Sequence, residues 1–108
     1  MKYCVIANLK MNLPAQVDKL QSDILAHIAN KLTWGAVHST GITGEDGKPA
    51  HSLSIRFEHE EDMNILYDFI KDRMIKIPVL GGKVSKHPCP HDIGGVPCAI
   101  SEEYVKEI

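Results

Sequence analysis

The sequence has no apolar run long enough to cross a bilayer and no excess of charge of one sign. A membrane-spanning helix needs about 20 consecutive, mostly apolar residues, and no stretch of this chain approaches that length. Its 12 basic and 14 acidic residues give a formal net charge of −2, whereas nucleic-acid binders usually carry a cationic face that neutralises phosphates. We therefore expect neither a membrane protein nor a nucleic-acid-binding protein.

Cysteine is scarce, and the N-terminus lacks a signal-peptide pattern. The 3 cysteines are an odd number and too few for a disulfide scaffold. The opening segment MKYCVIANLKMN has neither a long apolar core nor a small-residue cleavage site. These features predict a cytoplasmic protein whose thiols are reduced.

Internal repeats, low-complexity tracts and Ser/Gly-rich linkers are also missing from the sequence. Its 108 residues are therefore predicted to form one domain that spans 1–108. Apolar residues make up 44% of the chain, which is enough for a single modest core.

The spacing of apolar residues predicts both helices and strands. Steps of three and four between apolar residues predict helices over 13–30 and 60–77. A short helix is also predicted over 101–108, because Ser101 is a good N-cap and glutamates follow it. Strands are predicted over 2–9, 33–42, 50–60 and 79–84.

This β-α-β-β-α-β order is typical of the ferredoxin-like fold, an α+β architecture. We expect an antiparallel sheet with two helices on one face, followed by an appendix over 85–108. The appendix would consist of an irregular His/Cys/Pro loop and the short C-terminal helix. Because the other face of the sheet would need a cover, we expect self-association through that face, as a homo-oligomer.

The most distinctive segment is HPCPHDIGGVPC, residues 87–98. Zinc accepts both imidazole and thiolate ligands and binds four of them in a closed structural site. The candidate metal ligands are His87, Cys89, His91 and Cys98. Two alternatives stay open: a loop that its prolines stiffen without any metal, and a reactive Cys89 thiol whose pKa a neighbouring imidazolium lowers. Zinc analysis of the purified protein would separate the metal site from the other two.

Two hypotheses on function follow. The first is a non-catalytic binding or regulatory domain, because no catalytic motif is present. The alternative is a small enzyme that uses His38 and His51, or Cys89, in a pocket at the end of the sheet. His38 and His51 are therefore candidate ligand-binding residues, and a pocket between them would favour the enzyme.

Overall fold

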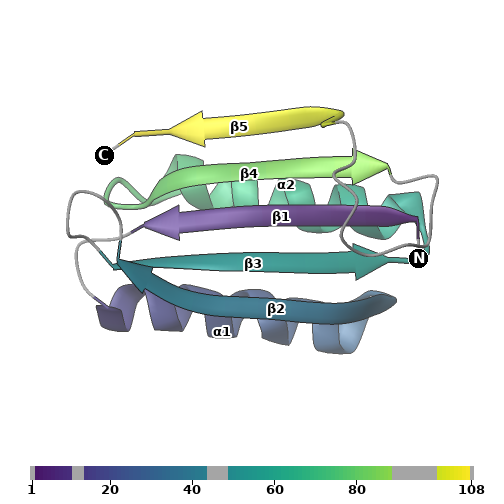
Figure 1. The fold of residues 1–108 in the computed structure, drawn as a ribbon, viewed down its shortest axis with the longest axis horizontal. Helices are drawn as coiled ribbons and strands as arrows, with labels where there is room; N and C mark the ends of the chain where they lie inside the picture. The colour runs from purple at the N-terminus through teal and green to yellow at the C-terminus, as the bar shows by residue number, and fades with distance from the viewer. Residues whose placement is uncertain (1, 11–13, 44–48, 89–99, 108) are drawn as a thin grey trace.

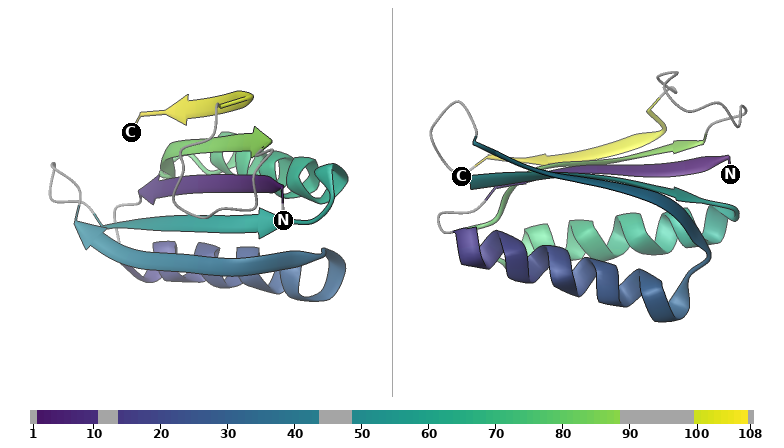
Figure 2. Two further views of the ribbon diagram at one scale, coloured as in Figure 1. Left: turned by 45° about the vertical axis from the view of Figure 1, so that its right-hand side comes forward. Right: turned by 60° about the horizontal axis from the view of Figure 1, so that its bottom comes forward.

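Five strands and two helices form two layers (Figure 1). The structure is a computed structural model that describes residues 2–10, 14–43, 49–88 and 100–107. In chain order the elements are β1 (Tyr3–Lys10), α1 (Pro14–Lys31), β2 (Trp34–Thr43), β3 (Pro49–Phe57), α2 (Glu60–Lys76), β4 (Gly81–Pro88) and β5 (Glu102–Lys106). The strands form one antiparallel, 5-stranded sheet in the order β2-β3-β1-β4-β5. Figure 2 shows both helices on the same side of this sheet.

The prediction of a ferredoxin-like (βαββαβ) domain that ends in a helix is wrong. The sheet has 5 strands in the order β2-β3-β1-β4-β5, because the C-terminal segment Glu102–Lys106 is a strand and pairs with β4. The predicted loop also starts too early, since Ser85 belongs to β4. Tyr104 and Val105 suit a strand, and the edge of β4 offers them backbone partners. This pairing outweighs the local helix-start signal at Ser101.

Both long helices lie within one residue of their predicted bounds. The first turn of α2 is acidic and its last turn is basic, a polarity that the helix dipole favours. The backbone N–H of Thr33 donates to Asp62 Oδ2 at 3.0 Å, which ties the end of α1 to the start of α2. No helix in the described part of the chain is both long and apolar enough to cross a membrane.

The core lies between the helices and one face of the sheet. Successive side chains of a strand point to opposite faces, so alternate residues of each central strand enter this core. The buried cluster consists of Val5, Ala7, Leu9, Leu20, Ile24, Ile28, Leu53, Ile55, Phe57, Met63, Leu66, Tyr67, Ile70, Met74, Leu80 and Val84.

The remaining positions of the strands form the face opposite the helices, which we call the open face. On β1 it carries Cys4, Ile6, Asn8 and Lys10, and on β3 Ser52, Ser54 and Arg56. On β4 and β5 it carries Lys83, Ser85, His87, Glu103 and Val105. Polar side chains therefore dominate this face.

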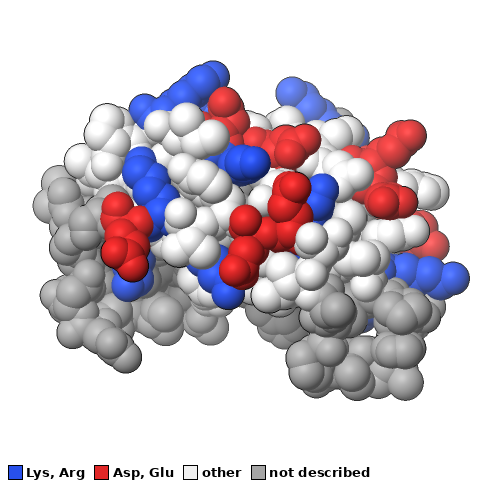
Figure 3. Space-filling view, turned by 90° about the horizontal axis from the view of Figure 1, so that it is seen from above, with Lys and Arg blue, Asp and Glu red and all other residues white. Residues whose placement is uncertain are grey.

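Side chains of β5 contact both the helix layer and the neighbouring strand β4. Lys106 crosses to the helix layer, where its Nζ donates to the carbonyl oxygens of Met74 at 2.6 Å and Ile77 at 2.8 Å. On the open face, Lys83 Nζ lies 3.1 Å from Glu103 Oε2. Figure 3 views the molecule from the side of this edge and shows acidic and basic side chains interspersed along it.

One contact between the helices contains a titratable ring. His27 of α1 stacks on Phe69 of α2 with ring centroids 4.3 Å apart and planes at 10°. Its Nε2 is buried and has no hydrogen-bond partner within the described residues. Burial, and after it the positive charges of Lys31 and Arg73, lowers the pKa of His27 below its ordinary value.

This lowered pKa predicts that the protein loses stability in mild acid. The unfolded chain binds the His27 proton more tightly than the folded chain does. The contribution of neutral His27 is therefore complete above a pH of about 6.5, the ordinary histidine pKa. It falls as the pH drops from there to the lowered native pKa. We expect the free energy of unfolding in urea to fall between pH 7.5 and 5. In the His27→Gln variant this fall should be smaller. His59→Gln, at an exposed histidine, is the control, and equal effects of both substitutions would contradict the assignment.

Candidate functional site

One end of the open face holds a group of buried and half-buried polar side chains, which we call the polar cluster: Cys4, Ser54, Ser85 and His87. Ser85 Oγ lies 2.8 Å from His87 Nε2, in hydrogen-bond contact. The Ser85 hydroxyl also donates to the Ile6 carbonyl at 3.5 Å, and Cys4 Sγ lies 3.7 Å from Ser54 Oγ. Ser85 is only 3% exposed and His87 only 6%. The cluster is thus internally hydrogen-bonded and largely shielded from water.

His87 is the one predicted metal ligand that the structure describes. It lies near the end of β4, and the strand register places its Cα opposite that of Cys4. The other three candidates, Cys89, His91 and Cys98, lie outside the described residues. Within the described ranges, no group of three or more His, Cys, Asp and Glu side chains is placed to hold a metal ion. Zinc binding by the loop therefore stays a prediction.

Cys4 is a member of the polar cluster to which the sequence analysis assigns no function. Burial raises the pKa of the Cys4 thiol, and this effect exceeds the lowering by the Ser54 hydrogen bond and the Arg56 charge. The thiol is therefore protonated at neutral pH, whereas a nucleophilic cysteine needs the thiolate. The polar cluster is suited to holding β1, β3 and β4 together.

The two histidines of the enzyme hypothesis lie on β2 and β3 but are not partners in the sheet. His38 pairs with Ser54, whereas His51 pairs with Gly41 on β2 and with Leu9 on β1. The register does not place them opposite each other. Their proposed use as ligand-binding residues stays a prediction.

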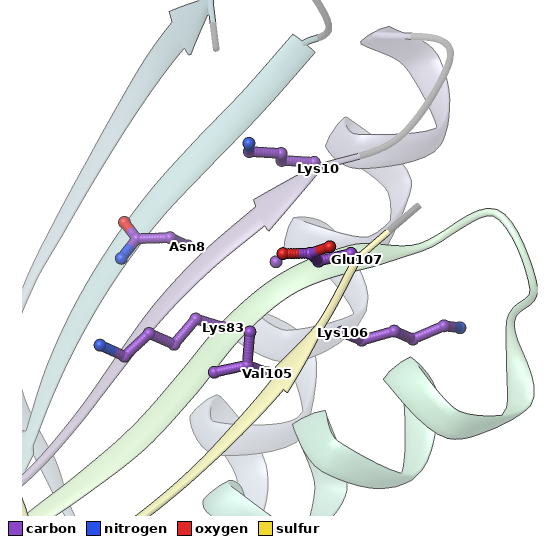
Figure 4. Close-up of a pocket in the computed structure, with 7 residues that line it drawn as sticks. Asn8, Lys10, Lys83, Val105, Lys106 and Glu107 are labelled. Atoms are coloured by element: carbon purple, nitrogen blue, oxygen red, sulfur yellow. The ribbon is translucent and has the colours of Figure 1, made fainter. Parts of the chain in front are cut away.

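The other end of the open face contains a hollow of about 380 Å³ between β1, β4 and β5 (Figure 4). Its lining residues come from both ends of the chain. They are Asn8, Lys10, Gly82, Lys83, Val105, Lys106 and Glu107. We refer to this feature as the hollow.

The strand register explains why these residues meet. Lys83 of β4 pairs with Asn8 of β1 on one side and with Val105 of β5 on the other. Next to it, Gly82 has a φ of 120°, and a Cβ there would lie 1.9 Å from the Asn8 carbonyl oxygen. Only glycine fits such a conformation and such a close approach. Glycine at position 82 therefore allows β4 to approach the backbone of β1 this closely beside the hollow.

The lysines that line the hollow differ in their surroundings. Lys83 is paired with Glu103, and the ammonium of Lys106 is bound to carbonyl oxygens at the end of α2. Figure 4 shows Lys106 directed away from Asn8, Lys10 and Lys83, toward the helix layer. Lys10, by contrast, has no ion-pair partner within the described residues.

Comparisons with known proteins do not add to this picture. No protein-family model matches the chain, and searches of curated proteins and of solved structures found no match. The geometry of the open face is therefore the basis for an argument on function.

The hollow was missed by the sequence analysis because its lining residues share no motif. Asn8 and Glu107 are far apart in the chain and are polar residues of ordinary types. The one local sign is the pair Gly81-Gly82 at the start of a strand, which indicates a bulge or a close backbone approach. That signal does not reveal which side chains surround the glycines.

The polar cluster leads to a prediction about stability. Ser85→Ala removes a hydroxyl that contacts buried His87, and a buried polar group that loses a partner costs about 1–3 kcal/mol. We expect the free energy of unfolding in urea to fall by about this amount. Ser52→Ala is the control. Ser52 lies on β3 and, like Ser85, belongs to the open face, but it is outside the polar cluster. Equal losses in the two variants would show that the Ser85–His87 contact contributes nothing specific.

Proposed function

We propose that the chain is a small, cytoplasmic, non-catalytic binding domain that holds a small polar ligand in the hollow. The observation that carries this proposal is the convergence of polar and charged side chains from three strands around one depression of about 380 Å³. Ligand pockets usually measure about 300–1,000 Å³ and place a few polar groups to orient the ligand. The free thiol of Cys4 supports the cytoplasmic location.

The unused bonding capacity of the hollow supports the proposal. Within the described residues, no hydrogen bond or ion pair engages the side chains of Asn8, Lys10 or Glu107. These groups are hydrated in the free protein and can exchange water for ligand. The polar cluster at the other end of the open face has already made its contacts within the fold.

The proposal is tested by NMR titration of the protein with phosphate, acetate and L-leucine. We expect at least one of these probes to shift the backbone amides of Asn8, Lys83 and Val105. Val105 is 56% exposed, so Val105→Trp fills the hollow without disturbing the core and is expected to abolish the shifts. Ile100→Trp, at an exposed residue outside the hollow, is the matched control. Shifts confined to the helix layer, or none with any probe, would contradict the proposal.

Self-association through the open face is a further part of the proposal. Both helices lie on the other face (Figure 2), and Ile6 places a partly exposed apolar side chain in the middle of the open face. A second copy of the chain would cover this side chain.

Sedimentation equilibrium measures this association directly. We expect a concentration-dependent dimer that Ile6→Lys shifts toward monomer, because a buried ammonium would lose its hydration. Ile65→Lys is the control, since Ile65 is an exposed residue of α2. A strictly monomeric protein at high concentration would remove self-association from the proposal.

A further inference from the structure

We infer that the hollow binds the zwitterionic head group of an α-amino acid. This inference rests on the proposed function and names the ligand class. A ligand in an exposed site gains most of its binding energy from charged groups that no protein partner already neutralises. The charged side chains of the hollow therefore differ in what they offer a ligand.

Of the four charged residues among the described lining of the hollow, two already have partners in the protein. Glu103 lies 3.1 Å from Lys83 and compensates its charge. The Lys106 ammonium donates to the carbonyl oxygens of Met74 and Ile77 in the helix layer. Among the described residues that line the hollow, the charges that remain for a ligand are one cation, Lys10, and one anion, Glu107.

This pair of opposite charges discriminates among ligands. A simple anion would be attracted by Lys10 and repelled by Glu107, and a simple cation would experience the reverse. A molecule that carries both a carboxylate and an ammonium group is attracted by both residues at once. Figure 4 shows Lys10 at the end of β1 and Glu107 beyond the end of β5, so the two residues come from different parts of the sheet.

The remaining lining residues fit the rest of an amino acid. The Asn8 side chain offers both a donor and an acceptor, which suits a carboxylate or an ammonium group. Val105 pairs with Lys83 in the sheet and exposes its methyl groups, so it can contact an aliphatic side chain. Leucine combines these features and is therefore the probe of choice.

Three probes of similar shape test the inference by NMR titration. L-leucine carries both charges, L-leucinamide lacks the carboxylate, and 4-methylpentanoate lacks the ammonium group. The hollow is open to solvent and exposed ion pairs are weak, so we expect dissociation constants of about 1 mM. We expect leucine to bind about tenfold more tightly than either analogue, with shifts at Asn8, Lys83 and Val105.

Two substitutions assign the charges. Lys10→Ala should weaken the binding of leucine and of 4-methylpentanoate, and it should strengthen the binding of leucinamide because a repulsion is removed. Glu107→Gln should weaken the binding of leucine and of leucinamide, and it should strengthen the binding of 4-methylpentanoate because a repulsion is removed. Lys19→Ala, at an exposed lysine of α1, should change none of the three.

The outcomes separate this inference from the proposed function. If an analogue with a single charge, or phosphate, binds in the hollow as tightly as leucine, the zwitterion inference is wrong and the proposed function stands. If leucine binds but neither Lys10→Ala nor Glu107→Gln weakens it, the inference is also wrong. If no probe shifts the amides around the hollow, both fail.

Discussion

The alternation of side chains along β1 is the constraint on which both the core and the open face depend. β1 lies between β3 and β4 and pairs with both. Val5, Ala7 and Leu9 enter the core, so the residues between them must face away from the helices. A slip of one residue would bring Asn8 against the helices and expose the apolar set. The large cost of such a slip fixes the register, and the register in turn brings Asn8 and Lys83 together.

The hollow depends on a second constraint, the attachment of β5. Strand β5 has no fully buried side chain, although Tyr104 packs against the core. Its backbone pairs with β4, and Lys106 binds carbonyl oxygens near the end of α2. Basic side chains commonly satisfy the last carbonyl groups of a helix in this way. The end of α2 thereby holds in place the strand that supplies Val105 to the hollow.

The sequence predicts those elements whose local pattern and tertiary environment agree. The two long helices each bury one apolar stripe, and their spacing alone defines them. The C-terminal segment is different, because Ser101 and the following glutamates favour a helix locally. Its conformation is decided by pairing with Lys83 and Lys86 of β4, which no local pattern encodes. The wrong assignment of this one segment changed the predicted fold.

The candidate site shows the same division between local and long-range information. Conspicuous residues such as His87 drew attention to one end of the open face, yet the structure shows His87 in contact with Ser85 and buried. A raised pKa likewise keeps the Cys4 thiol uncharged. A binding site needs groups that exchange water for ligand without breaking contacts inside the protein. Within the described residues, the side chains of Lys10 and Asn8 in the hollow have no contacts that a ligand would need to break. Histidine and cysteine, the residue types typical of catalytic and metal sites, therefore stabilise the fold here. The groups that are available to a ligand are ordinary polar residues.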